Sequence, residues 1–509
     1  MSSFGDRLRR LRREVDQKAE AQAQGDAAAG TPGTDRRAAG APHGAVAGES
    51  DRREWLRARL RAREREGPRA KGGRRQAQER PAPPTTHHQK TSGMPADLVE
   101  DQSERGPFVA RVIDLPASHR HGHFGLDEVD AAEDLAWLAR DPALAGLDPR
   151  TAVYLDIETT GLSGGAGTWP FMVALGAFEG DRFVLWQGFM RGPHEEEALL
   201  AEVARRVRAS SGVVSFFGKS FDRHRLEDKM RLHKIDPGFA ERPHLDLYHP
   251  LNRLYTRRAG WDRVARGAAA PPGAGLANGK LGTMERGLIG LPRKDDLSGA
   301  HAPEAWFAFL DQRPHLLEEV FRHNALDVWS LVALVAHLGR TRSETRADGQ
   351  PLGGPPLARA LGLAALARDH ADREAERAYL ELAQERLAAQ PVEGFLGAHS
   401  RGRDEQVPGQ VPAELVLWHA DALRLSGAPA AALERYAELE TRRALPPRIL
   451  ARCAAERAKL LENHAKDPAA ALEACEVARA ACVQGLASPR FRADLDKRAA
   501  RLTAKLARD

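Results

Sequence analysis

A chain of 509 residues exceeds one ordinary hydrophobic core, so we expect two or three structural units. Hydrophobic residues account for 42% of the chain, yet no run of eighteen or more apolar residues occurs, so we expect no transmembrane helix. The formal net charge of +5 permits a polyanionic partner without requiring one.

The N-terminus is rich in arginine and has no apolar stretch of the kind that a secretory signal needs, so we expect no secretion. Three cysteines occur, all near the C-terminus and without metal-ligand spacing: Cys453, Cys475 and Cys482. An odd and sparse set of cysteines is typical of reduced thiols, and we therefore expect a cytoplasmic protein.

Residues 1–105 are rich in Arg, Ala, Gly, Pro and Gln and contain almost no aromatic or β-branched residues. Such a segment cannot bury enough apolar surface to offset the entropy lost on ordering, so we predict a disordered basic tail. One short helix is expected at residues 4–15, where apolar residues recur at helical spacing. The composition suits either a basic arm that follows phosphates or docks a partner, or a solvated segment.

From residue 107 the composition changes, and residues 108–113 alternate like a strand. His119, His121 and His123 follow, but no cysteine or further histidine lies at ligand spacing, so we assign no metal to them. Residues 127–138 carry a short helical pattern.

Residues 153–162 read Val-Tyr-Leu-Asp-Ile-Glu-Thr-Thr-Gly-Leu, an apolar strand-forming run that ends in a turn. Side chains alternate faces along a strand, so Asp156 and Glu158 point the same way. Two buried carboxylates on one face repel each other and lose hydration, and a divalent cation supplies the compensation. A pair of strand-end acids in solvent is the simpler alternative.

The next elements predict an antiparallel sheet and the helices that cover it. Residues 171–176 and 183–189 form two strands joined at Glu179-Gly180-Asp181, a hairpin signal. With the preceding strand they make a three-stranded antiparallel unit. Residues 195–207 form an amphipathic helix with acids in its first turn, where the helix dipole favours them.

Residues 212–217 form a buried strand that delivers Asp222 to the start of a helix at 223–233. Gly218-Lys219-Ser220 looks like the end of a phosphate-binding loop, but position 213 is Val where that motif requires an upstream glycine. Lys219 and Arg223 are candidates for sequence-independent contacts with nucleic acid.

Residues 244–250 form a short strand that runs into a helix, and we expect Asp246 to support the acidic cluster rather than join it. Residues 265–278 look like a flexible insertion rich in Ala, Pro and Gly. Arg293 and Lys294 are candidates for phosphate contact, and a plain surface role suits them equally.

Residues 316–338 form a strongly apolar helix that carries His323 and Asp327. A separation of four residues places both side chains on one face, one turn apart. A surface histidine beside a structural aspartate is the simpler alternative.

After residue 355 the pattern is helical throughout. Residues 415–439 place Trp418, Gly427 and Tyr436 at a spacing typical of a tetratricopeptide-type helix pair, and a plain helical bundle is the alternative. We therefore predict a tail at 1–105, an α/β domain at 106–345 and a helical domain at 355–509.

The motifs resemble a known family. The runs Asp156–Leu162, Gly218–Asp222 and His323–Asp327 are similar to the three motifs of the DEDD exonucleases, and residues 155–167 resemble the YprB-like branch in particular. The resemblance spans roughly residues 107–340 and implies a ribonuclease-H-like mixed sheet flanked by helices. Phe217 departs from the family's Asn, and His323 stands at the spacing that tyrosine has in one branch.

The resemblance implies a metal-dependent 3′-to-5′ exonuclease that acts on a single strand or a 3′ end of DNA or RNA. Two Mg²⁺ or Mn²⁺ ions would be held by Asp156, Glu158, Asp222 and Asp327, since all-oxygen ligands favour these metals. His323 would take the proton of the attacking water.

Two alternatives remain open. The α/β domain could be catalytically weak, the protein then serving as a nucleic-acid-binding scaffold with a protein partner on its C-terminal helices. The enzyme could also be a different phosphodiesterase, such as an endonuclease.

Overall fold

The computed structural model describes residues 95–161, 168–257, 260–264, 271, 273–293, 301–313, 316–389, 411–442, 445–484 and 488–508. The predicted tail up to residue 94 with its helix at 4–15, residues 265–270 and 272 of the predicted insertion at 265–278, and Lys294 lie outside these residues.

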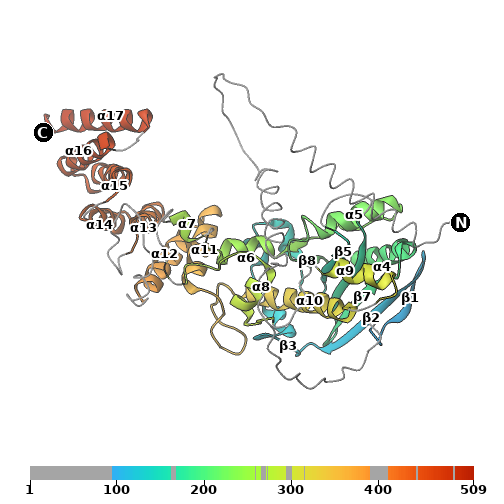
Figure 1. Ribbon diagram of the computed structural model, residues 1–509. Coiled ribbons are helices and arrows are strands. Elements are labelled where there is room, and N and C mark those ends of the chain that lie inside the picture. Colours follow the sequence, from blue (N-terminus) through green and yellow to red (C-terminus); the bar gives the residue numbers. More distant parts are fainter. Residues whose placement is uncertain are drawn as a thin grey trace, which may run out of the picture.

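A seven-stranded mixed sheet forms the core of the α/β part (Figure 1). Its spatial order is β1-β2-β7-β6-β5-β8-β9. The contacts from β1 to β5 are antiparallel, and those of β5 with β8 and of β8 with β9 are parallel. The strands are β1 (Val99–Ser103), β2 (Gly106–Pro116), β5 (Val153–Thr159), β6 (Pro170–Glu179), β7 (Arg182–Phe189), β8 (Val213–Ser215) and β9 (His244–Asp246). This arrangement confirms the predicted α/β fold class and the antiparallel unit β5–β6–β7.

The prediction that disorder extends to residue 105 is wrong at its C-terminal end. Strand β1 lies inside that range and pairs with β2 over its whole length, from Val99 opposite Ala110 to Ser103 opposite Gly106. Its residues are polar or exposed, and Val99 is 56% exposed. The hydrogen-bonding edge of β2, rather than burial, therefore explains this strand.

The helical prediction at 127–138 is also wrong as a single element. The segment divides into the 3-10 helix η1 (Leu126–Ala131) and the short helix α3 (Leu135–Ala139). Between them Asp134 has a φ of 56°, in the left-handed region, which interrupts the helical geometry. A two-stranded ribbon of β3 (Arg120–His121) and β4 (Phe124–Gly125) precedes η1, and η2 (Pro142–Gly146) follows α3.

Strand β5 separates two apolar cores because its residues alternate faces. Tyr154 belongs to the core that contains most of α10 (Leu317–Gly339). Leu155 belongs to the opposite core, which contains α4 (Glu196–Ala209), α5 (Asp222–Leu232) and α9 (Ala302–Leu310). Asp156 and Glu158 share the face of Tyr154, so they look toward α10.

Further short elements lie between β9 and α9 and before α4. They are η3 (Pro193–Glu195), α6 (Tyr248–Tyr255), α7 (Trp261–Val264), α8 (Leu281–Met284) and the π-helical turn η4 (Glu285–Ile289). Within the described residues, no helix is both long and apolar enough to cross a membrane.

The C-terminal part is helical and leads away from the sheet to the C-terminus (Figure 1). Its elements are α11 (Pro356–Asp369), α12 (Arg373–Ala388), α13 (Ala413–Leu425), α14 (Pro429–Glu440), α15 (Pro447–Leu460), the π-helical turn η6 (Leu461–Ala465), α16 (Pro468–Gln484) and α17 (Pro489–Leu506). These helices pack through three consecutive apolar cores.

The helical part shares apolar cores with the α/β part. Trp261 and Val264 of α7 are buried in one core with residues of α11, α12 and α13, and Leu363 of α11 joins the core over β5. At Gly362 of α11 a Cβ would lie 2.7 Å from the Cα of Leu254, so only glycine allows this approach of α11 to α6. The boundary between the two parts is a packed seam.

Candidate active site

The first two predicted metal ligands, Asp156 and Glu158, lie in the C-terminal half of β5. Glu158 is only 8% exposed, and a register shift between Glu158 and Thr159 ends the regular pairing with β6. A bulge of this kind re-aims the side chains next to it, and it is common beside functional sites.

Asp222 is the first residue of α5, and it is 8% exposed. The loop from β8 to α5 turns tightly at Gly218, where a Cβ would lie 2.3 Å from Ser215 Oγ and 3.1 Å from Asp222 Oδ2. Glycine at this position therefore allows the acid to approach the end of β8.

Asp246 fastens this loop from the end of β9. Its carboxylate accepts hydrogen bonds from the backbone amides of Phe217 at 2.7 Å, Lys219 at 3.1 Å and Tyr248 at 3.1 Å. Burial raises the pKa of Asp246, and these amides oppose that rise. Through these contacts Asp246 holds the loop that leads to Asp222, and its place outside the acidic cluster stays a prediction.

Helix α10 supplies the residues opposite β5. Asn324 donates from Nδ2 to Asp156 Oδ2 at 2.7 Å, and its Oδ1 accepts a hydrogen bond from Gln187 Nε2 at 2.8 Å. Both amides are fully buried. The sequence prediction missed Asn324 and Gln187; a buried amide between His323 and Asp327 on an apolar helix was the available signal.

The four predicted carboxylates lie within electrostatic reach of one another. Burial raises the pKa of Asp156 well above its usual range, and the negative charges of Asp327, Glu158 and Asp222 raise it further. The hydrogen bond from Asn324 acts in the opposite direction. Asp156 therefore lies in a negative field that a cation would relieve.

Arg293 lies between α10 and η4 and joins the site. One guanidinium nitrogen forms an ion pair with Asp327 Oδ1 at 2.5 Å and also pairs with Glu285, which is fully buried. Nη1 of Arg293 lies 3.4 Å from Nδ1 of His323. Glu285 was not predicted as a residue of the site, because it is far from the acidic motifs along the chain.

Glu285 and His121, one of the three clustered histidines, both contact Ser330 of α10 behind the acidic site. Burial raises the pKa of Glu285, which Arg293 and a hydrogen bond from Ser330 oppose. Ser330 Oγ lies 2.8 Å from His121 Nε2. Burial, helped by the charges of Arg293 and His119, lowers the pKa of His121 to about 4, so the ring is neutral near pH 7.

The donor set suits a hard divalent cation, since it consists of carboxylates without a thiolate. Across the described ranges, however, no group of three or more His, Cys, Asp or Glu side chains is arranged so that it could hold a metal ion. Asp327 is instead ion-paired with Arg293, and His323 Nε2 lies 3.8 Å from Asp327 Oδ2.

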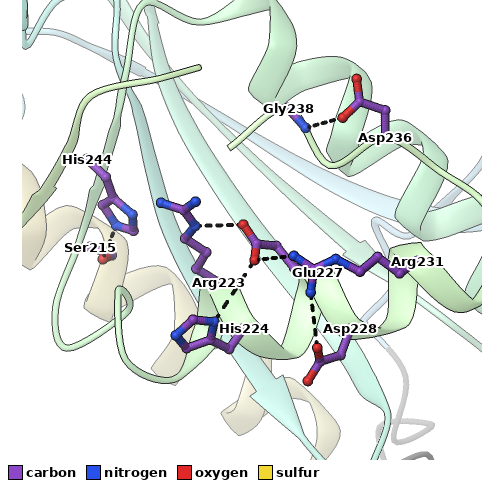
Figure 2. A network of polar contacts seen from close by, with 9 residues as sticks. All are labelled: Ser215, Arg223, His224, Glu227, Asp228, Arg231, Asp236, Gly238 and His244. Carbon is purple, nitrogen blue, oxygen red and sulfur yellow. Dashed lines mark hydrogen bonds and ion pairs between the residues drawn. The ribbon is translucent and has the colours of Figure 1, made fainter. Parts of the chain in front are cut away.

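The two predicted nucleic-acid-binding cations have acidic partners. Lys219 Nζ lies 3.0 Å from Asp141 Oδ2, and Arg223 Nε donates to Glu227 Oε1 at 2.7 Å. Figure 2 shows Glu227 on α5 also contacting His224 and Arg231. Contact of Lys219 and Arg223 with nucleic acid stays a prediction.

The part of the chain that carries these residues is similar to known proteins. Residues 153–339 match the RNase_H_2 family model of the RNase_H superfamily. The chain is also similar to the "Uncharacterized protein YprB" of Bacillus subtilis (strain 168), with 30% identity over 253 residues. That similarity covers 49% of this chain and 56% of the relative, so the chain spans about half the length of the relative it matches. Residues 153–339 are thus similar to the RNase_H superfamily.

Proposed function

We propose that the protein is a metal-dependent 3′-to-5′ exonuclease that hydrolyses phosphodiester bonds of DNA or RNA. The observation that carries the proposal is the environment of Asp156, whose pKa is raised by burial and by three neighbouring carboxylates. A fold that gathers four acids around one buried strand end bears an electrostatic cost. Such a cost is common where a site binds cations or performs chemistry.

The acids Asp156, Glu158, Asp222 and Asp327 would hold Mg²⁺ or Mn²⁺. A bound divalent cation stabilises charge that develops on a phosphate and makes water a better nucleophile. The remaining contributions come from the chain itself. Asn324, held by Gln187, fixes Asp156 through Oδ2 and leaves Oδ1 of that carboxylate for other partners.

His323 is the candidate proton acceptor. Nδ1 of His323 lies 3.4 Å from Nη1 of Arg293, and its Nε2 lies 3.8 Å from Asp327 Oδ2, so the ring stands beside the predicted metal ligands. A neutral imidazole is the form that can take a proton from water near pH 7. Arg293, which Glu285 orients, lies next to both Asp327 and His323 and could bind a phosphate oxygen there.

The test is hydrolysis of 5′-labelled single-stranded DNA and RNA with Mg²⁺ or Mn²⁺, comparing wild type with Asp156→Asn and Asp327→Asn. We expect a ladder that shortens from the 3′ end in wild type and at least a hundredfold loss in both variants. Internal cuts in wild type would instead identify an endonuclease. No cleavage with any metal would overturn the enzymatic proposal.

The scaffold alternative is favoured by the ion pair between Arg293 and Asp327, because this contact neutralises one acid without any metal. Under that alternative the protein binds single-stranded DNA and RNA but cleaves neither of them. The same assay, accompanied by a binding measurement, separates the two functions.

A further inference from the structure

A groove with a volume of about 740 Å³ lies on the C-terminal helices, away from the acids of β5. It is lined by residues of α7, α11, α12, α13 and α15. Five arginines from four of these helices face it: Arg368, Arg373, Arg424, Arg448 and Arg452. Residues far apart in the sequence thus bring the same charge and the same planar donor group to one surface.

Two of the three acids in the lining are engaged by the protein itself. Glu376 accepts hydrogen bonds from Trp418 Nε1 at 2.6 Å and from Arg373 Nη1 at 2.6 Å. Asp421 accepts a hydrogen bond from Tyr436 at 2.7 Å and forms an ion pair with Arg452. These two carboxylates therefore order the wall of the groove, and Glu414 is the third acid of the lining.

The groove retains an excess of positive charge, because five arginines face three acids in its lining. Arg368 and Arg448 are exposed, and neither makes an ion pair within the described part of the chain. The guanidinium carbon of Arg368 lies 4.5 Å from the ring centroid of Trp418, which is half-buried, so this arginine rests on an aromatic face. Such stacking holds the guanidinium in place while its edges remain able to donate hydrogen bonds.

We propose that this groove binds the phosphodiester backbone of a single-stranded nucleic acid, ahead of its entry into the nuclease domain. The proposal rests on the nucleic-acid substrate argued above and adds a second place where that substrate is held. Arginine forks pair with phosphate through two hydrogen bonds, and arginines beside an aromatic ring are typical of surfaces that bind single strands. Val264 of α7, which lies within residues 153–339, forms part of the wall. The groove therefore begins at the edge of that domain.

The experiment measures the affinity of the full chain for fluorescein-labelled oligothymidylate and oligouridylate of about 30 nucleotides, by anisotropy in EDTA. The variant Arg368→Glu with Arg448→Glu reverses the two unpaired charges. We expect its Kd to rise about tenfold or more at low salt. The slope of log Kd against log salt concentration should decrease by about one to two units, because two cations that contact phosphate are lost.

A matched control reverses two exposed cations of α17 that lie outside the groove, Arg490→Glu with Lys497→Glu, and should leave Kd within about twofold. The milder pair Arg368→Gln with Arg448→Gln should give an intermediate loss. Equal Kd values for wild type and the groove variants would overturn the proposal. Polyglutamate serves as a competitor in the same measurement. If it binds wild type more tightly than either oligonucleotide does, and if its binding requires Arg368 and Arg448, the groove binds an acidic peptide and the proposal is overturned.

The outcomes for the groove and for the exonuclease are separable. Binding in EDTA does not depend on hydrolysis, so an inactive protein with arginine-dependent binding would refute the exonuclease and leave the groove supported. In an active protein, the charge reversals should raise KM for the long strand and leave kcat/KM for an oligomer of about six nucleotides unchanged.

Discussion

Asp156 is the residue on which the electrostatics of the site converge. Its carboxylate is half-buried, lies near three other acids and receives one hydrogen bond from Asn324. Because the folded protein holds the proton of Asp156 more tightly than the unfolded chain does, its contribution to stability is greatest at acidic pH. That contribution is lost as the pH rises through the raised pKa.

Replacing this carboxylate should therefore stabilise the protein when no metal is added. In EDTA near pH 7, Asp156→Asn is expected to raise the melting temperature by about 2 °C or more, and the gain should shrink toward pH 4. The exposed control Asp494→Asn should leave it unchanged. Mn²⁺ should raise the melting temperature of wild type and not of Asp156→Asn. A variant that melts below wild type at neutral pH would contradict the proposed charge cluster.

Asn324 is the second residue whose role is testable alone. Asn324→Leu keeps a similar volume but removes a hydrogen-bond partner from Asp156 and from Gln187. Leaving buried polar groups unmatched should lower the free energy of unfolding by about 1–3 kcal/mol, measured in urea. Asn463→Leu, at an exposed position, should change it by less than about 0.5 kcal/mol. Equal losses in both variants would refute the role of Asn324.

Part of this constellation was accessible from sequence. The four acids and His323 lie in short runs whose spacing defines a strand face or a helix turn. Glu285 and Arg293 were not accessible as a support for Asp327, because their contacts come from the packing of η4 against α10. Phe217 has a φ of 66°, a conformation that Asn tolerates better, yet its contact with Asp246 comes from the backbone amide and survives the substitution.

At the scale of the elements, the loop from β8 to α5 decides where Asp222 stands. In Gly218→Ala the new Cβ would lie 2.3 Å from Ser215 Oγ and 2.6 Å from Ser215 Cβ, and moving Ser215 away would disturb its hydrogen bond with His244 Nε2. We expect a loss of about 1–3 kcal/mol in unfolding free energy and roughly a tenfold or greater fall in kcat/KM. Gly146→Ala, whose Cβ meets nothing within 4 Å, is the control. Full activity in Gly218→Ala would show that Asp222 does not need this turn.

The elements themselves were mostly predictable where burial imposes a period. Helix α10 runs from Leu317 to Gly339, close to the predicted 316–338, because its apolar residues recur at helical spacing. Strand β1 was not predictable, since its short polar sequence carries no burial pattern and depends on the edge of β2. Local sequence describes an element well when the core, rather than a neighbouring strand, selects it.

At the scale of the whole molecule, the packed seam at α6 and α11 should make the two parts unfold together. Gly362→Val would place side-chain atoms against the backbone of Leu254 and separate the two helices. We expect faster proteolysis between α10 and α11 and a second unfolding transition in urea. Ala388→Val, at an exposed position of α12, introduces the same β-branched side chain into a helix without the clash. A single transition in both variants would contradict the seam.

Helix α10 connects the acidic site to the seam with the C-terminal helices. At 1.5 Å per residue its 23 residues span about 35 Å, and about 15 Å separate Asp327 from His337. His337 lies 2.8 Å from the hydroxyl of Tyr255, at the seam with the C-terminal helices. A helix is stiff along its axis. A shift of α10 at His337, where it contacts Tyr255, would therefore also shift Asp327. The position of Asp327 is therefore set partly by side chains that lie about 15 Å away along the helix.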